Sequence, residues 1–233
     1  MIKNTHPDQN KRRTFLKQFA AGAAILGTGM LAAPFQSIAG DHSPSPDISD
    51  ADEWFKQVKG KHRMVFDVTE PNGSLPFAWP RIFMLTNAKT GTPENDCGIV
   101  VVLRHSAIAY AFGNAIWEKY KFGEVFKIND DKTKAPATQN PFWQPKPGTF
   151  KTPGIGEVKI GIDELQASGV KFCACDVAIT VHCAVIAEQT HQDLDTVKND
   201  WMAGLLPGIQ PVPSGIWAVG RAQEHGCAYC FAG

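Results

Sequence analysis

The sequence predicts a three-layer α/β/α domain, in which helices cover both faces of a mostly parallel, five-stranded sheet. Short runs of apolar and β-branched residues alternate along the chain with longer stretches of helical periodicity. The run 98–103 is apolar at every position after its glycine, as in a strand that is buried on both faces of a parallel sheet. With 43% hydrophobic and 20% charged residues, the 233-residue chain can form one core of this kind.

The segment 1–39 has the features of an export signal. Paired arginines, Arg12 and Arg13, precede an apolar stretch at 19–33, and small residues follow at 37–39, where a signal peptidase would cleave. The apolar stretch is too short and too rich in glycine for a transmembrane helix. The segment resembles a twin-arginine (Tat) signal, which implies export of the folded protein to the periplasm and no stable membrane anchor after cleavage.

The charge balance changes when this segment is removed. The whole chain has 23 basic and 23 acidic residues, but five basic residues and one acidic residue lie in 1–39. The remainder has 18 basic and 22 acidic residues, a net charge of −4. A general nucleic-acid binder is excluded, because affinity for phosphates needs a basic excess.

The remaining elements follow in order. Residues 40–60 form a Ser-, Pro- and Asp-rich linker with a short helix at 52–58, and 61–233 form the domain. Strands are expected at 64–69, 98–103, 170–174, 210–212 and 227–231. Helices are expected at 77–87, 107–119, 162–168, 176–189, 195–204 and 215–224, with Pro80 near a first turn, Asp195 and Ser214 as N-caps, and Gly169 and Gly226 as stops.

One long segment, 134–156, lacks a periodic pattern and contains five prolines. Phe142 and Trp143 lie within it. Two interpretations are open, a functional or docking surface and an ordered surface segment whose aromatic side chains pack into the domain.

Cys175 is the first candidate for chemistry. It lies between the strand 170–174 and the helix 176–189, at the carboxyl end of a parallel strand, where open α/β sheets place their sites. The following helix N-terminus favours a thiolate, although Asp176 opposes this in part. The alternative is a buried, inert thiol.

Arg104 and His105 follow the buried strand 98–103 and would lie at the same edge of the sheet. If the two strands are neighbours, Arg104 can bind an anion such as a sulfur oxoanion, and His105 can act as a base or a ligand. The alternative is a pair with a capping or packing role.

Three further cysteines suggest a second chemistry. Cys173 shares a strand face with Cys175, and Cys227 and Cys230 form a CxxC that fits a redox pair, half a metal site or a disulfide. If Cys227 and Cys230 lie on a true strand, they point to opposite faces and cannot pair. Cys173, Cys175, Cys227 and Cys230 would bind a metal only if their strands adjoin.

The other candidates receive structural roles. Cys97 and Cys183 are expected in the core, and His182 and His191 on helix surfaces. The chain contains no GxGxxG between a strand and a helix, no Walker loop and no HExxH, so nucleotide or phosphate transfer has no support.

Three blocks carry a family resemblance, which covers roughly residues 64–231. They are 169–175 (GVKFCAC), 206–215 (LPGIQPVPSG) and 221–226 (RAQEHG), and the chain resembles the DsrE/DsrF-like family through them. The resemblance implies a flavodoxin-like sandwich, a homo-oligomer and a role in handling sulfur. Some members carry a persulfide on a cysteine after the fourth strand, and the matching position here is Cys175.

Three functional hypotheses follow. The first is an exported carrier, at most sulfurtransferase-like, in which Cys175 takes up sulfur from a small molecule or a partner protein and Arg104 and His105 assist. The second is a metal- or cofactor-binding module that uses the clustered cysteines. The third is a non-catalytic assembly protein that docks through Phe142 and Trp143.

Overall fold

The computed structural model describes residues 50–233, so the predicted export signal and most of the linker lie outside the described residues. The described part begins with helix α3 (Ala51–Phe55), which lies in the region where a short helix was expected. Among residues 50–233, no helix is both long and apolar enough to cross a membrane.

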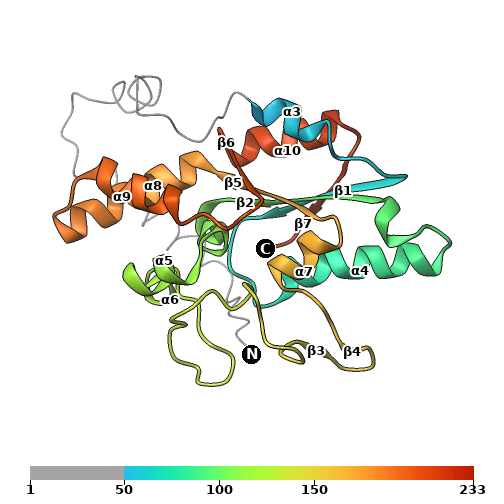
Figure 1. Cartoon of the computed structure of the whole chain (residues 1–233), viewed down its shortest axis with the longest axis horizontal. Coiled ribbons are helices and arrows are strands. Elements are labelled where there is room, and N and C mark those ends of the chain that lie inside the picture. Colours follow the sequence, from blue (N-terminus) through green and yellow to red (C-terminus); the bar gives the residue numbers. More distant parts are fainter. Residues whose placement is uncertain (1–49) are drawn as a thin grey trace, which may run out of the picture. The chain divides into compact units, whose positions relative to one another are not determined.

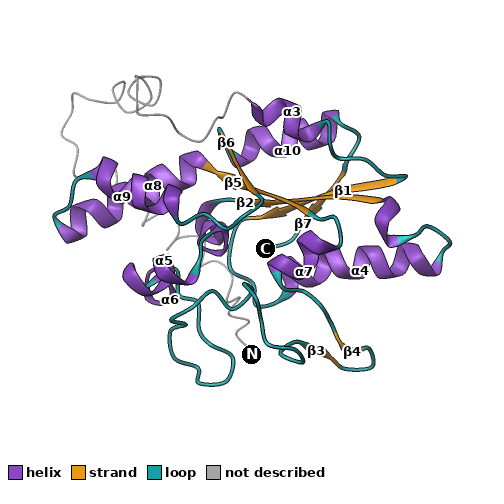
Figure 2. Cartoon of the chain, viewed as in Figure 1, coloured by secondary structure: helices purple, strands orange, loops and turns teal. Residues whose placement is uncertain are grey.

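The main sheet has five parallel strands in the order β6-β5-β2-β1-β7, as Figures 1 and 2 show. Each strand lies where the sequence predicts one. The bounds are β1 (His62–Val68), β2 (Cys97–Leu103), β5 (Lys171–Cys175), β6 (Ile209–Val212) and β7 (Ala228–Phe231). The central strand β2 is buried at all seven positions, as its continuous apolar sequence predicts.

Helices cover both faces of this sheet, so the predicted α/β/α architecture is confirmed. Helices α3 and α10 (Gly215–Glu224) cover one face, whereas α4 and α7 lie on the other (Figure 1). The remaining helices are α4 (Leu75–Lys89), η3 (Glu94–Asp96), η4 (His105–Ala111), α5 (Asn114–Lys119), α6 (Phe122–Val125), α7 (Ile162–Ala167), α8 (Asp176–Thr190) and α9 (Leu194–Ala203).

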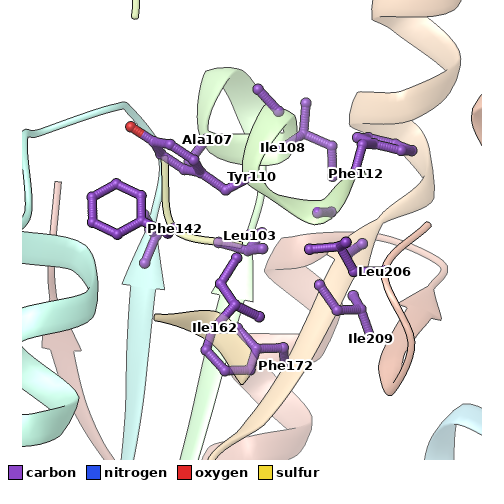
Figure 3. Packing of buried hydrophobic residues seen from close by; sticks show 14 of the residues in the cluster. Leu103, Ala107, Ile108, Tyr110, Phe112, Phe142, Ile162, Phe172, Leu206 and Ile209 are labelled. Atoms are coloured by element: carbon purple, nitrogen blue, oxygen red, sulfur yellow. The ribbon is translucent and has the colours of Figure 1, made fainter. Parts of the chain in front are cut away.

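Alternation along the strands separates two apolar clusters. In β1, Val65 packs into the cluster under α3 and α10, and Phe66 packs into the larger cluster on the opposite face. The larger cluster, part of which Figure 3 shows, contains most of the aromatic side chains, including Phe77, Tyr110 and Trp201. Each fully buried side chain of this size contributes roughly 1.5–3 kcal/mol to folding.

The prediction of one continuous helix at 107–119 is wrong at residues 112 and 113. A 3₁₀ helix ends at Ala111, and α5 begins only at Asn114. Between them Phe112 is extended and forms an isolated β-bridge with Leu205, and the Gly113 amide donates to the Gly204 carbonyl at 3.0 Å. These tertiary hydrogen bonds replace the helical ones, and sequence periodicity does not encode them.

Two local predictions also need correction. The N-cap of α9 is Asp193, whose Oδ1 accepts the Thr196 amide at 2.9 Å, whereas Asp195 lies in the first turn. Helix α4 begins at Leu75, so Pro80 lies beyond the first turn, where its missing amide leaves the Pro76 carbonyl without a helical donor. The Ser214 cap is confirmed, since its Oγ accepts the Trp217 amide at 3.2 Å.

The proline-rich segment is an ordered wrap over the larger cluster. It contains only the short hairpin strands β3 (Lys151–Thr152) and β4 (Gly156–Glu157). Phe142 is buried, with its ring centroid 4.2 Å from that of Phe77 and 5.0 Å from that of Phe150. The interpretation in which its aromatic side chains pack into the domain is therefore correct for Phe142, which is only 4% exposed.

Candidate functional site

Polar side chains gather at the carboxyl edge of the sheet, where several parallel strands end. Arg104 follows β2, and Cys175 ends the neighbouring strand β5. On the other side of β2, strand β1 contributes Asp67, which is opposite Val102 in the ladder. Strands β2 and β5 are therefore neighbours, which is the condition under which Arg104 and Cys175 were expected to lie at one crevice.

Asp67 forms the centre of a hydrogen-bonded network across three strands. Its Oδ1 accepts from Arg104 Nε at 2.6 Å, and its Oδ2 accepts from Arg104 Nη2 at 2.9 Å. The Tyr229 hydroxyl, on the edge strand β7, donates to the same Oδ2 at 2.9 Å. Two parallel bonds between a guanidinium and a carboxylate fix the plane and the direction of the Arg104 side chain.

The charge of Arg104 is secured by this pairing. The pKa of its guanidinium is raised, chiefly by the hydrogen bond to Asp67, while burial acts in the opposite direction. The charge of Cys175 makes a small contribution to the same rise. Arg104 also lies against the start of α10, where a Cβ atom on Gly215 would come within 2.5 Å of Arg104 Cδ. A glycine at this position lets the helix approach the arginine.

Cys175 is the N-cap of α8. Its Sγ accepts the Ala178 amide at 3.3 Å, which satisfies one of the free amides at the start of the helix. The negative charge of Asp176 beside it is balanced, because Lys198 of α9 lies 3.0 Å from the Asp176 carboxylate. Cys175 itself is 6% exposed, so it is buried but not sealed from solvent.

His105 does not join this arrangement. Its backbone is left-handed (φ 51°), its Nδ1 lies 3.0 Å from Ser106 Oγ, and among residues 50–233 no hydrogen bond joins it to Cys175. Its neighbour is instead His182, which was expected on the helix surface but is half-buried against Phe126. The pKa of His182 is lowered, first by burial and then by the charge of His105.

Cys173 and Cys175 do not share a face as the sequence suggests. Cys173 is fully buried in the cluster under α3 and α10, and Cys175 packs with the opposite cluster. The reason is that Cys175 is the last residue of β5, where the backbone turns into α8. Burial raises the pKa of the Cys173 thiol strongly, so this thiol is neutral and inert at physiological pH.

The terminal CxxC is also divided between the two faces of the sheet. Cys227 packs under α3 and α10, and Cys230 packs against the opposite cluster, so both thiols are free and no disulfide joins them. Burial raises the pKa of each. The two side chains lie on opposite faces, as expected for a strand, although β7 itself begins at Ala228, one residue after Cys227.

The four cysteines that might share a metal are not brought together. Strands β1 and β2 separate β7 from β5, which places the two cysteine segments about 14 Å apart. Within the described part of the chain, no group of three or more His, Cys, Asp or Glu residues is arranged to hold a metal ion. Cys97 and Cys183 are both buried, as predicted, and His191 is exposed, as predicted.

Sequence reasoning missed Asp67 and Tyr229. A signal for Asp67 was present, because a charged residue near the end of the apolar strand 64–69 occupies the same edge as Arg104 and Cys175. No such signal existed for Tyr229, since its role depends on β7 lying beside β1.

Fold and site define this chain as an α/β protein with a five-stranded parallel sheet flanked by helices and a cysteine at the carboxyl edge. No family model matches the sequence. No curated protein matches it either. Among solved structures, the chain is similar to the protein of unknown function MTH1491 from Methanobacterium thermoautotrophicum, with a TM-score of 0.38 and 18% identity over 73% of this chain and 99% of that one. Function is therefore inferred from the residues at the carboxyl edge.

Proposed function

We propose that the protein is an exported sulfur carrier of the DsrE/DsrF-like type, in which Cys175 holds sulfur as a persulfide. The observation that carries this proposal is the position of Cys175, the N-cap of α8 and a neighbour of the strand that leads to Arg104. A helix N-terminus and an arginine both stabilise negative charge on sulfur.

The proposed step exchanges one sulfur–sulfur bond for another. Cys175 gives its proton to water, and the thiolate attacks the outer sulfur of a persulfide R–S–SH. The S–S bond of the donor breaks, R–S⁻ leaves and takes up a proton, and Cys175 becomes Cys–S–SH. No net electrons are gained or lost, so the step needs no separate oxidant.

Arg104 is proposed to orient the anionic donor. Its Nε and Nη2 are held by Asp67, and no described residue accepts a hydrogen bond from Nη1. This remaining N–H group can bind a negatively charged sulfur or oxygen atom of the donor. Asp67 then acts as a positioning residue, because it sets the direction of the guanidinium.

Mass spectrometry of the protein after incubation with glutathione persulfide tests the proposal. We expect one added sulfur atom on Cys175 in the wild type and none on Cys175→Ser. Cys230→Ser is the matched control, since Cys230 is the only cysteine that is more than slightly exposed. Added sulfur on Cys230 with Cys175 unmodified and shown to be free would contradict the proposal.

Export by the twin-arginine route is part of the same proposal and rests on Arg12 and Arg13. Fractionation of cells that express Arg12→Lys/Arg13→Lys should leave the protein in the cytoplasm, whereas Lys3→Gln should still be exported. Periplasmic accumulation of the double variant would exclude this route.

The family resemblance further implies a homo-oligomer, and one helix face supports this. Val177, Val181 and Val185 lie four residues apart on α8 and are 38%, 55% and 46% exposed. Such a row of exposed valines fits the same row of a second copy. Light scattering should give a smaller molar mass for Val181→Glu than for the wild type. A wild type with the mass of a monomer would contradict this part of the proposal.

A further inference from the structure

A partly enclosed cavity of about 370 Å³ lies under the proline-rich segment, in a part of the fold that the sulfur proposal does not use. Its lining comes from the turn after β1, from η4, from the loop after α6 and from the proline-rich segment. The lining includes the aromatic residues Tyr110, Phe142 and Phe150 and the charged residues Lys127, Asp130, Asp131 and Lys132. Cavities of a few hundred Å³ with aromatic walls and few polar groups are typical of small-molecule sites.

Tyr110 supplies an unsatisfied polar group to this cavity. The residue is only 1% exposed, and no described residue forms a hydrogen bond with its hydroxyl. Figure 3 shows this hydroxyl pointing away from Phe112, on the outer side of the labelled cluster. In the described part of the chain, the buried side-chain atoms that lack a partner do not include this oxygen, so the hydroxyl keeps contact with the cavity, where a ligand atom or water can bind it.

The apolar wall of the cavity is a stack of aromatic rings. Phe142 lies between Phe77 and Phe150, with ring centroids 4.2 and 5.0 Å away, and Tyr110 meets Phe142 edge-on with ring centroids 5.4 Å apart. Phe150 is half-buried and is the outer ring of this stack, and an open aromatic face favours a planar aromatic guest.

The charged residues of the same cavity are not equally available. The Asp130 carboxylate is occupied, because its Oδ1 accepts the amides of Lys132 and Thr133 at 3.1 and 2.7 Å. Asp131 lies 3.9 Å from Lys134. The ammonium groups of Lys127 and Lys132 have no acidic partner within 4 Å among residues 50–233, so each can pair with a negative group of a ligand, while the charges of Lys127, Asp130, Asp131 and Lys132 sum to zero.

We propose that this cavity binds a planar aromatic anion of one or two fused rings, such as an aromatic carboxylate or sulfonate. The rings would lie against Phe150, the Tyr110 hydroxyl would donate to a polar atom of the ligand, and Lys127 and Lys132 would hold its negative group. The site uses none of Asp67, Arg104 and Cys175, so ligand binding here can be tested independently of sulfur transfer to Cys175.

The protonation state of Tyr110 agrees with this role. Burial, and to a smaller extent the charge of Asp131, raises the pKa of its hydroxyl. The group is therefore a donor throughout the neutral range and does not compete with the ligand as an anion.

A pair of fluorescent probes tests both the aromatic and the anionic part. 8-Anilinonaphthalene-1-sulfonate (ANS) and N-phenyl-1-naphthylamine have the same ring system, and only the first carries a sulfonate. We expect the folded chain to bind one ANS per protein at least tenfold more tightly than the neutral probe. Binding should also raise the thermal midpoint, because a ligand of the native state stabilises it.

Three variants locate the binding. Tyr110→Phe should weaken ANS about three- to tenfold, the value of one neutral hydrogen bond. Lys127→Gln/Lys132→Gln should bring the two probes to nearly equal affinity. Lys121→Gln is the matched control. Like Lys127, Lys121 is exposed and has a left-handed backbone conformation (φ 50° for Lys121 and 56° for Lys127), but it does not line the cavity.

Several results would overturn the proposal. They are the absence of ANS binding, equal affinity for the two probes in the wild type, unchanged ANS affinity in Tyr110→Phe, or a lowered thermal midpoint, which indicates binding to unfolded chains. Both variants keep the packed rings, so circular dichroism should show native secondary structure in each.

Discussion

Strand β5 contains Cys173 and Cys175, and strand β7 contains Cys230 and follows Cys227, yet the two pairs of cysteines differ in what they can do. Strand β5 is internal and leads directly into α8, so Cys175 caps a helix while Cys173 is sealed in the core. Strand β7 is at the edge, and its CxxC is split between the two faces of the sheet. The chemistry of a thiol in this sheet therefore depends more on the element that follows its strand than on the spacing of the cysteines.

Asp67 lies between the two regions and joins Arg104 to Tyr229 of β7, so its loss should have the largest effect. Asp67→Ala removes the partner of Arg104 and Tyr229, and we expect a loss of about 3 kcal/mol in the free energy of unfolding. The value is at the low end for a buried pair, because the Arg104 side chain is 23% exposed and can turn to water. Urea unfolding measures it.

A double-mutant cycle controls for this effect. Asp67→Ala/Arg104→Ala should cost less than the sum of the two single changes, because the double variant leaves no unpaired buried charge. Strict additivity would show that the observed ion pair does not couple the residues.

The next largest effect is expected when a cysteine is replaced by serine, and the loss in the free energy of unfolding should differ between β5 and β7. Cys173→Ser places a hydroxyl in a fully buried apolar site and should cost roughly 1–3 kcal/mol. Cys230→Ser, at a half-buried edge position, should stay within about 0.5 kcal/mol. Equal losses in the two variants would remove the distinction between the internal strand and the edge.

The pH dependence of the free energy of unfolding should also be stronger for Cys173 than for Cys230. The pKa of Cys173 is raised by burial in the folded chain, whereas unfolded thiols ionise from about pH 9. The contribution of this thiol to the free energy of unfolding is therefore fully present below that pH. Above it the contribution declines, by up to about 1.4 kcal/mol per pH unit.

Tyrosines, whose ordinary pKa is about 10, add to the decline of stability between pH 9 and 10, so the contribution of Cys173 is measured as the difference between two cysteine variants. Burial raises the pKa of Cys183 to about 12, so this thiol adds to the same decline. Urea unfolding at both pH values should show a shallower decline in Cys173→Ala than in Cys230→Ala. The reverse order would contradict the burial of Cys173.

Tyr229→Phe should have the smallest effect. The hydroxyl bond to Asp67 is lost, but the bidentate pair with Arg104 remains, and Tyr229 is 47% exposed. We expect about 0.5 kcal/mol from urea unfolding. A loss as large as that of Asp67→Ala would mean that the edge strand, and not Arg104, holds the carboxylate in place.

The sequence by itself determined the alternation of strands and helices, because a buried parallel strand and an amphipathic helix leave different periodic patterns. It also placed Arg104 and Cys175 at one edge, since the carboxyl ends of parallel strands coincide. Only the tertiary structure decided that β7 pairs with β1, which brings Tyr229 to Asp67 and keeps the CxxC away from Cys175. Strand order, the break at Phe112 and the cavity beside Tyr110 depend on contacts between residues far apart in the chain, and local periodicity carries no information about such contacts.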